Sequence, residues 1–316
     1  MNLAHAKDIL VTKLVTLRPH ADVFDAIHLL LRHRITGAPV IDEKGQLLGV
    51  FSDKSCMNVL AAALGTCGQE HQISSTLPQA KDVMVTRLMT TTPGMDAFEA
   101  VGRLLKKRVS GAPVIDDEGK FVGVFSERYA MKMLIGSVCD QLPTMDVSEC
   151  MNTDFKRVIS EDVDLPHMIQ LFVDHYFRRL CVLRNGTLVG QISRRDVLRV
   201  ARKLLTDSRR DPVRDYEKSH EEFRNTPAEE VFMVSTFMNK EPRTITEDTD
   251  FLSMAEIFLN TNNRRLPVLR EGELIGQISR RDLLQATYEM TAVPLERDSS
   301  LLYLSALVER RDAPIG

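Results

Sequence analysis

The 316-residue chain contains no tryptophan, only 6% aromatic residues and five cysteines, and no two cysteines form a Cys-x-x-Cys pair. An odd number of cysteines without metal-type spacing argues against a disulfide framework and a zinc site, and is typical of reduced thiols in the cytoplasm. The eight histidines are scattered, and the nearest pair, His28 and His33, does not share a helix face. We therefore expect a cytoplasmic protein without a bound metal.

Long hydrophobic runs are also missing. No stretch approaches the roughly 18 apolar residues of a membrane span, and the first residues have no apolar run of signal-peptide length. The net charge of −3 argues against general binding to nucleic acid or to a membrane surface. The sequence contains no GxxxxGK[ST], HExxH or GxSxG motif, so we expect no enzyme activity.

The sequence does contain one pattern four times, in residues 8–64, 82–138, 147–204 and 234–290. Each copy has apolar residues at positions i, i+3, i+4, i+7 and i+8, which form one face of an amphipathic helix. The four apolar stripes are Val23, Ala26, Ile27, Leu30 and Leu31; Ala97, Ala100, Val101, Leu104 and Leu105; Leu165, Met168, Ile169, Phe172 and Val173; and Phe251, Met254, Ala255, Phe258 and Leu259.

A predicted β-hairpin follows each stripe. Two short apolar runs, such as GAPVID and LLGVFS in the first copy, flank a polar turn that contains glycine. A second helix then begins at Ser52, Ser126, Ser193 or Ser279. Each copy is therefore a β-α-β-β-α unit, and fourfold repetition predicts an α/β repeat protein.

The spacing of the copies predicts two modules of two repeats each, residues 1–140 and 147–290. The second module would contain a charged linker over residues 206–230. Residues 291–316 form a tail in which Leu301, Leu304, Leu307 and Val308 share one face of a predicted short helix. We expect this helix to dock on its own domain, with a partner or dimer helix as the alternative.

The β-α-β-β-α unit, with Gly-h-h-Ser-x-x-Asp after the hairpin (h is an apolar residue), resembles the CBS domain, which works in tandem pairs called Bateman modules. The resemblance covers nearly the whole chain. It implies binding of adenosine compounds, such as AMP, ADP, ATP or S-adenosylmethionine, in clefts between paired repeats. It also implies regulation of an enzyme, a transporter or a separate protein partner.

The helix start after each hairpin differs between the two halves of the chain. The four sequences are SDKS, SERY, SRRD and SRRD, and the leading serine suits a helix N-cap in all of them. An acid in the first turn is favoured by the helix dipole, but that reason applies equally to all four helices. Asp196 and Asp282 occur only in the last two, where Ser55 and Tyr129 stand in the first two. A carboxylate can accept hydrogen bonds from both ribose hydroxyls, and the resemblance implies this contact.

Arginine doublets divide the chain in the same way. They precede the third and fourth hairpins and follow the serines there, whereas the first two hairpins begin with Thr36–Gly37 and Ser110–Gly111. Exposed arginines usually only face solvent, but four doublets near helix N-termini suit an oligophosphate and favour AMP, ADP or ATP over S-adenosylmethionine. The resemblance implies that adenine lies against the strands. The predicted ligand residues are Asp196, Asp282, Ser193, Ser279, Arg178, Arg179, Arg264, Arg265, Arg195, Arg281, Ile192, Ile278, Ser160 and Thr246.

These observations predict a stand-alone regulator that binds an adenine nucleotide in its second module, with or without Mg, and signals to an unknown protein partner by conformational change. The alternative is a ligand-free structural adaptor. The first module is expected to be structural, to bind the partner or to hold a different ligand. The modules would pair within one chain as a four-repeat disk, or between chains as a homodimer.

Overall fold

The computed structural model describes residues 5–64, 77–140, 145–207 and 232–291. Residues 208–230 of the predicted linker and the predicted tail helix lie outside the described residues. No helix among those described is long and apolar enough to cross a membrane. Within the same ranges, no three histidine, cysteine or acidic side chains gather as a metal site would require.

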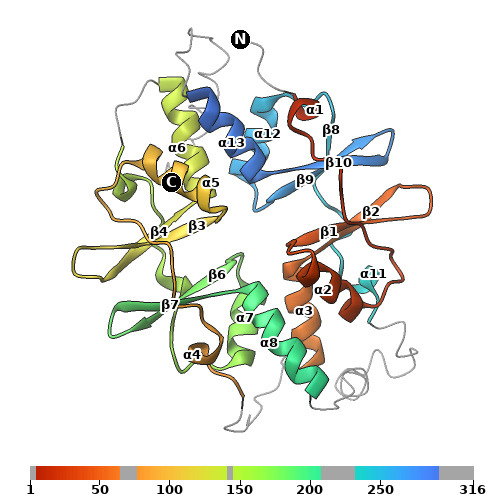
Figure 1. The fold of residues 1–316 in the computed structure, drawn as a ribbon. Helices are drawn as coiled ribbons and strands as arrows, with labels where there is room; N and C mark the ends of the chain where they lie inside the picture. The colour runs from red at the N-terminus through yellow and green to blue at the C-terminus, as the bar shows by residue number, and fades with distance from the viewer. Residues whose placement is uncertain (1–4, 65–76, 141–144, 208–231, 292–316) are drawn as a thin grey trace, which may run out of the picture.

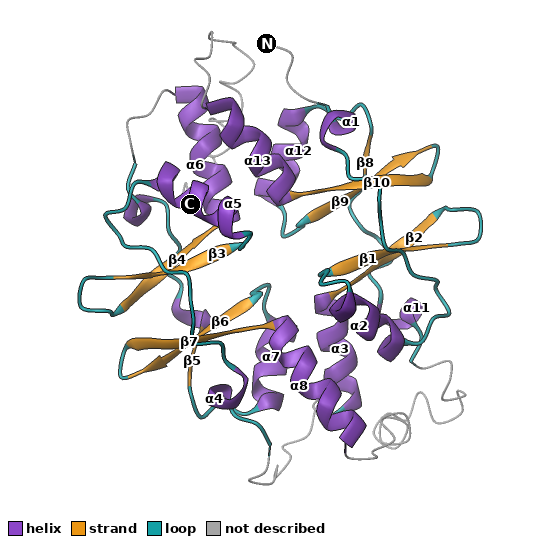
Figure 2. Ribbon diagram, in the orientation of Figure 1, coloured by secondary structure: helices purple, strands orange, loops and turns teal. Residues whose placement is uncertain are grey.

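Four α/β units surround the centre of the molecule, which confirms the predicted fold class (Figures 1 and 2). The first repeat consists of α2 (Val23–Arg32), β1 (Gly37–Ile41), β2 (Leu47–Ser52) and α3 (Asp53–Ala63). The second consists of α5 (Ala97–Lys107), β3 (Gly111–Ile115), β4 (Phe121–Ser126) and α6 (Glu127–Asp140). The third consists of β5 (Val158–Ser160), α7 (Leu165–Asp174), β6 (Arg179–Arg184), β7 (Thr187–Ser193) and α8 (Arg194–Asp207). The fourth consists of β8 (Ile245–Thr246), α12 (Phe251–Asn260), β9 (Arg265–Arg270), β10 (Glu273–Ser279) and α13 (Arg280–Thr291).

A short leading segment precedes each repeat. These segments contain α1 (Ala6–Ile9), α4 (Ala80–Val83), the 3-10 helices η1 (Val147–Glu149) and η2 (Phe155–Arg157), and α11 (Val234–Phe237). The predicted first strand of the unit forms in the third and fourth repeats as β5 and β8, each parallel to the next strand. In the first two repeats it is reduced to single parallel bridges, Leu17 to Val40 and Thr91 to Val114.

The apolar stripes form helices α2, α5, α7 and α12, as predicted. An aspartate caps the N-terminus of each one and accepts hydrogen bonds from backbone N–H groups of its first turn. In every helix the first four stripe residues are buried and the fifth is partly exposed. The repeated sequence pattern therefore marks the face of each helix that enters the core.

The core joins repeats that are not neighbours in the sequence. Helix α3 of the first repeat packs on α7 and α8 of the third, and α6 of the second packs on α13 of the fourth. One cluster of buried apolar side chains combines the first and third repeats, and a second cluster combines the second and fourth. Each core cluster therefore draws residues from both halves of the chain.

The leading segments connect the repeats in a different combination. Val11, ahead of the first repeat, pairs with Gln277 in β10 of the fourth, and Asn239, ahead of the fourth, pairs with Val50 in β2 of the first. The second and third repeats exchange their leading segments in the same reciprocal way. Figure 1 accordingly shows β1–β2 beside β9–β10, and β3–β4 beside β6–β7.

The sequence groups the repeats as residues 1–140 and 147–290, and this grouping stays a prediction. In the structure, β-bridges join the first repeat to the fourth and the second to the third, and the core clusters join the first to the third and the second to the fourth. The hairpin glycines permit this exchange. A Cβ at Gly276 would lie 2.7 Å from the carbonyl oxygen of Val11, and one at Gly190 would lie 2.3 Å from the sulfur of Met84.

Candidate functional site

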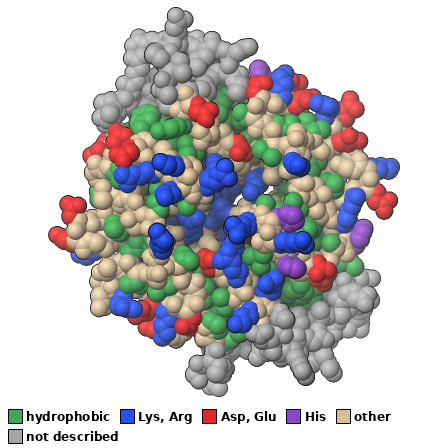
Figure 3. All heavy atoms as spheres, viewed as in Figure 1, with side chains coloured by type: hydrophobic (Ala, Val, Ile, Leu, Met, Phe, Trp, Pro, Cys, Tyr) green, Lys and Arg blue, Asp and Glu red, His purple; other side chains and the backbone are tan. Residues whose placement is uncertain are grey.

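A cavity of about 370 Å³ at the centre of the molecule has walls from all four repeats. Figure 3 shows lysine and arginine side chains gathered around a hollow at the centre of this face. Among the described residues, three carboxylates line the cavity: Asp53, Glu127 and Asp282. Its arginines are Arg34, Arg108, Arg178, Arg179, Arg194, Arg195, Arg264, Arg265 and Arg281. With nine cations against three anions, the cavity is suited to a strongly anionic ligand.

Strand starts and helix starts of the third and fourth repeats bring these arginines together. Arg179 and Arg265 are the first residues of β6 and β9, and Arg178 and Arg264 directly precede them. Arg195 and Arg281 lie in the first turns of α8 and α13. The structure therefore places all six predicted phosphate-binding arginines on the wall of one cavity.

Several of these guanidinium groups are held by atoms of the first two repeats. Arg179 donates to the carbonyl oxygen of Gly111 at 2.9 Å, and Arg265 donates to the hydroxyl of Thr36 at 2.5 Å. Arg195 donates to the carbonyl oxygen of Arg34 at 2.7 Å. These bonds fix the direction of each planar group before any ligand enters, which reduces the entropic cost of binding.

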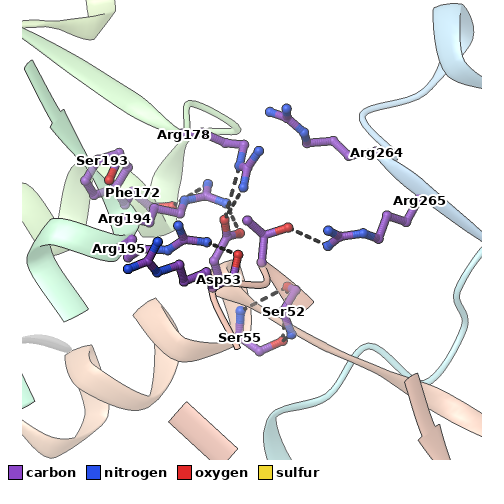
Figure 4. A network of polar contacts seen from close by, with 12 residues as sticks. Ser52, Asp53, Ser55, Phe172, Arg178, Ser193, Arg194, Arg195, Arg264 and Arg265 are labelled. Atoms are coloured by element: carbon purple, nitrogen blue, oxygen red, sulfur yellow. Dashed lines mark hydrogen bonds and ion pairs between the residues drawn. The ribbon is translucent and has the colours of Figure 1, made fainter. Parts of the chain in front are cut away.

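The buried carboxylate of Glu127 and the partly buried carboxylate of Asp53 hold further arginines. Asp53 receives Arg178 at 3.0 Å and Arg194 at 3.1 Å (Figure 4). Glu127 receives Arg264 at 2.8 Å and Arg281 at 2.9 Å. Each acid therefore pairs with two arginines from a repeat in the other half of the chain, and its single negative charge leaves a net positive charge in each group.

Sequence reasoning missed these two acids. Both directly follow the capping serine, at the position that arginine occupies in the last two repeats: SDKS and SERY against SRRD. The available signal was the opposite charge at one aligned position, which is acidic in the first two repeats and basic in the last two. It showed no partner because Asp53 and Arg178 are 125 residues apart in the sequence.

Burial and neighbouring charges shift the pKa of Asp53 and of several arginines in the cavity wall. Burial raises the pKa of Asp53, but the charges of Arg178 and Arg194 outweigh burial and hold the pKa below its ordinary value of 3.8. Burial, reinforced by the charge of Arg178, lowers the pKa of Arg264 well below its ordinary value. The same two causes lower the pKa of Arg179 and Arg265. Such desolvated arginines would be stabilised by an added anion.

The predicted ribose carboxylates both lie in capping boxes. Asp196 accepts hydrogen bonds from the backbone N–H and the hydroxyl of Ser193, at 2.9 and 2.5 Å. Asp282 accepts from the backbone N–H of Ser279 at 2.7 Å. The serines cap the helices in return, as the sequence predicted. Ser193, Ser279 and Asp282 line the central cavity, whereas Asp196 is not part of its wall.

The four predicted adenine contacts are not brought to this cavity. Ile192 and Ile278 are completely buried in the two core clusters. Ser160 and Thr246 are exposed at the ends of β5 and β8. Alternate residues of a strand point to opposite faces, and both isoleucines point toward the helices. The two repeats therefore share an isoleucine at this position because it packs in the core.

Two arginines of the first half complete the wall and were also missed. Arg34 and Arg108 follow helices α2 and α5 and have left-handed backbone conformations, with φ of 54° and 51°. This conformation usually favours glycine or asparagine, so arginine at both equivalent positions is notable. The pattern R-h-[ST]-G, which the first two hairpins share at their start, was the available signal.

A second cavity, of about 480 Å³, lies between the second and third repeats and reaches the fourth. Tyr129 lines it at the position that aspartate holds in the last two repeats, and its hydroxyl accepts a 2.7 Å hydrogen bond from Asn152. The two cavities share Arg178, Arg179 and Arg264 in their walls. A ligand in either cavity would therefore act on the same arginines.

Comparisons with known proteins identify the repeats. The CBS domain model matches residues 6–62, 80–136, 147–203 and 234–289. An uncharacterized protein of Methanocaldococcus jannaschii is 22% identical over 280 residues, which cover 86% of this chain and 95% of that protein. The inosine-5′-monophosphate dehydrogenase of the same organism is 23% identical over 127 residues, 40% of this chain but only 23% of the enzyme.

Solved structures show the same kind of likeness. One is a Methanocaldococcus jannaschii protein described as a proposed archaeal homolog of g-AMPK, with 21% identity, a TM-score of 0.39 and coverage of 89% of this chain and 99% of that one. Another is CBSX2 in complex with AMP, with 28% identity, a TM-score of 0.37 and coverage of 40% and 98%. On the four matches to the domain model, this chain belongs to the CBS-domain family.

Proposed function

We propose that this protein is a stand-alone regulator that binds an adenine nucleotide, AMP, ADP or ATP, with the phosphates in the central cavity. The observation that carries the proposal is the cavity wall, to which the described part of the chain contributes nine arginines from four repeats and three carboxylates. Phosphate groups accept paired hydrogen bonds from guanidinium groups, and the first turns of α8 and α13 add the positive ends of two helix dipoles. A metal ion such as Mg could accompany the phosphates.

Asp282 supports a nucleoside rather than a simple phosphate as the ligand. Its Oδ2 accepts from Ser279, and its other carboxylate oxygen has no hydrogen-bond partner among the described residues. Since the side chain lines the cavity beside Arg265 and Arg281, a ribose hydroxyl could donate to that oxygen while the phosphates reach the arginines. Asp196 is proposed as the equivalent contact in the third repeat. Among the similar proteins, CBSX2 was crystallised with AMP.

The ligand would regulate by joining repeats. Arg179 and Arg265 already reach across to Gly111 and Thr36, so an anion between them touches both halves of the chain. A ligand that binds one arrangement of the repeats better than another shifts the population toward it. A partner protein that recognises this arrangement would receive the signal; a homodimer is one such assembly.

Calorimetry with ATP, ADP and AMP tests the proposal. The double variant Arg179→Gln, Arg265→Gln should lose at least about a hundredfold in ATP affinity, because each charge-assisted hydrogen bond contributes about 1.5 kcal/mol or more. The matched control is Arg184→Gln, Arg270→Gln, at the opposite ends of the same two strands, where both arginines form surface ion pairs. The control should bind as the wild type does.

Asp282→Ala separates the ribose contact from the phosphate contacts. It should lower the ratio of ATP affinity to inorganic tripolyphosphate affinity about tenfold, because loss of the carboxylate charge affects both anions whereas only ATP has a ribose. If no adenine nucleotide binds the wild type or raises its melting temperature at millimolar concentration, the proposed function is wrong and the structural adaptor is favoured.

A further inference from the structure

Asp53 and Glu127 occupy positions in which an external anion would also fit. Arg178 donates to Asp53 from both Nε and Nη2, at 3.1 and 3.0 Å. Arg281 donates to Glu127 in the same two-pronged way, at 3.0 and 2.9 Å. In each pair both N–H groups donate to a single carboxylate oxygen, Asp53 Oδ2 or Glu127 Oε1, and the same edge of a guanidinium group can donate to phosphate oxygens. Each carboxylate thus fills a two-arginine site on the wall of the central cavity.

We propose that Asp53 and Glu127 are internal competitors of the ligand phosphates, which set how much negative charge a ligand must carry to bind the whole cavity. This inference rests on the proposed function, because it assigns the selectivity of the same site. It adds two specificity-determining residues that themselves need not touch the nucleotide.

The arrangement of the cavity arginines supports a competitive role. Four arginines carry the ion pairs: Arg178, Arg194, Arg264 and Arg281. Among the contacts of the described residues, Arg179, Arg195 and Arg265 are instead held by neutral oxygen atoms of the protein. A single phosphate can use this second set and leave the acids paired. A longer phosphate chain reaches Arg178 or Arg264, and there it must displace a carboxylate or lie close to its charge.

The ion pairs also connect ligand charge to the position of the repeats. Asp53 joins the first repeat to the third, and Glu127 joins the second to the fourth. These are the two pairs of repeats that share a helix core. Displacing a carboxylate by phosphate therefore breaks a contact between repeats, so a highly charged ligand and a weakly charged ligand would stabilise different arrangements.

The test measures binding of inorganic tripolyphosphate, ATP and AMP to Asp53→Asn and Glu127→Gln. Tripolyphosphate should bind each neutral variant about tenfold more tightly than the wild type, with a smaller gain for AMP, because the repulsion removed grows with ligand charge. Glu161→Gln is the matched control. It removes the same charge from an arginine pair with Arg184 at the surface, and its affinities should stay within about twofold of the wild type.

The charge-keeping variants Asp53→Glu and Glu127→Asp provide a second comparison if a neutral variant fails to fold. They should bind tripolyphosphate within about threefold of the wild type. The inference is overturned if the neutral variants bind tripolyphosphate equally, more weakly or not at all, or if the charge-keeping variants lose tenfold. Those results would mean that the acids only position the arginines.

The two proposals fail in different ways. If tripolyphosphate shows the expected gain but no variant binds ATP, ADP or AMP, the nucleotide assignment is wrong and the competition stands. If nucleotides bind the wild type and the neutral variants show no gain for tripolyphosphate, the competition is wrong and the nucleotide assignment stands.

Discussion

Asp53 links the chemistry of the cavity to the stability of the fold at the scale of a single residue. Its carboxylate is only 15% exposed, and two arginines of the third repeat compensate the loss of hydration. Removing one member of such a buried set leaves the remaining charges without compensation. The residue therefore contributes to stability at neutral pH even if it opposes the binding of a highly charged ligand.

The lowered pKa of Asp53 predicts a specific dependence of stability on pH. Since the folded pKa lies below the ordinary value of 3.8, the carboxylate stabilises the fold above about pH 4, and this contribution disappears as the pH falls through the folded pKa. Asp53→Asn should lower the free energy of unfolding by about 3 kcal/mol at pH 7. Below pH 4 the free energy of unfolding should fall less steeply with pH in the variant than in the wild type, because the variant has no carboxylate at this position to protonate. Urea unfolding at pH 7, 5, 4 and 3 checks both effects.

The exposed turn residue Asp117 provides the control for that measurement. Asp117→Asn removes the same charge without touching the cavity and should leave the free energy of unfolding within about 0.5 kcal/mol of the wild type. An Asp53→Asn curve that runs parallel to the wild-type curve below pH 4 would contradict the assigned ion pair.

Hairpins and leading segments determine the architecture at the scale of the element. Each hairpin carries one glycine where the leading segment of another repeat crosses, and in all four cases a Cβ there would approach that segment within about 3 Å. The repeated glycine is therefore a contact between repeats rather than a turn residue. Its presence in all four copies explains why one sequence pattern can produce a closed arrangement.

Gly276→Ala should destabilise the fold by about 1–3 kcal/mol, the usual cost of forcing extra volume into a packed contact. Its added methyl group would meet Leu10 and the carbonyl oxygen of Val11. Gly94→Ala is the control, because a Cβ there meets nothing within 4 Å. Thermal unfolding followed by circular dichroism compares the two variants. Equal melting temperatures would mean that the leading segment does not cross β10 as described.

At the scale of the whole molecule, the packing is interleaved: each core cluster combines a repeat from the first half of the chain with one from the second half. Residues 1–140 alone would expose the helix faces that bury themselves against the third and fourth repeats. Residues 145–316 alone would lack the same partners. The two halves are therefore expected to depend on each other, unlike two domains that each have their own core.

Expressing the halves separately and together tests this dependence. Alone, residues 1–140 and 145–316 should each show low solubility or no cooperative unfolding, whereas co-expression should yield a complex that elutes with the intact chain. Size-exclusion chromatography and thermal unfolding supply the readout. If each half is monomeric and unfolds cooperatively on its own, the two consecutive modules predicted from the sequence are right and the interleaved arrangement is wrong.

Much of the local structure could be predicted because it depends on residues close together in the sequence. The stripe from Val23 to Leu31 predicted both helix α2 and its buried face, and Ser279 predicted the start of α13. The arginines before β6 and β9 predicted the charge of the cavity wall. Ile192 and Ile278 were assigned to adenine on family likeness, whereas periodicity alone indicates ordinary strand residues, and the structure buries both in the core.

The sequence by itself determined the repeated unit, its apolar faces, its helix caps and the division of arginines between the two halves, since hydrogen bonding and side-chain periodicity act over a few residues. Only the tertiary structure decided which repeats share a core and which exchange strands. It also brought Asp53 to Arg178 and Glu127 to Arg264. The physical reason is that repeats with the same pattern of apolar residues offer similar surfaces to one another. Their pairing therefore depends on contacts between residues far apart in the chain, and the charge balance of the central cavity follows from that pairing.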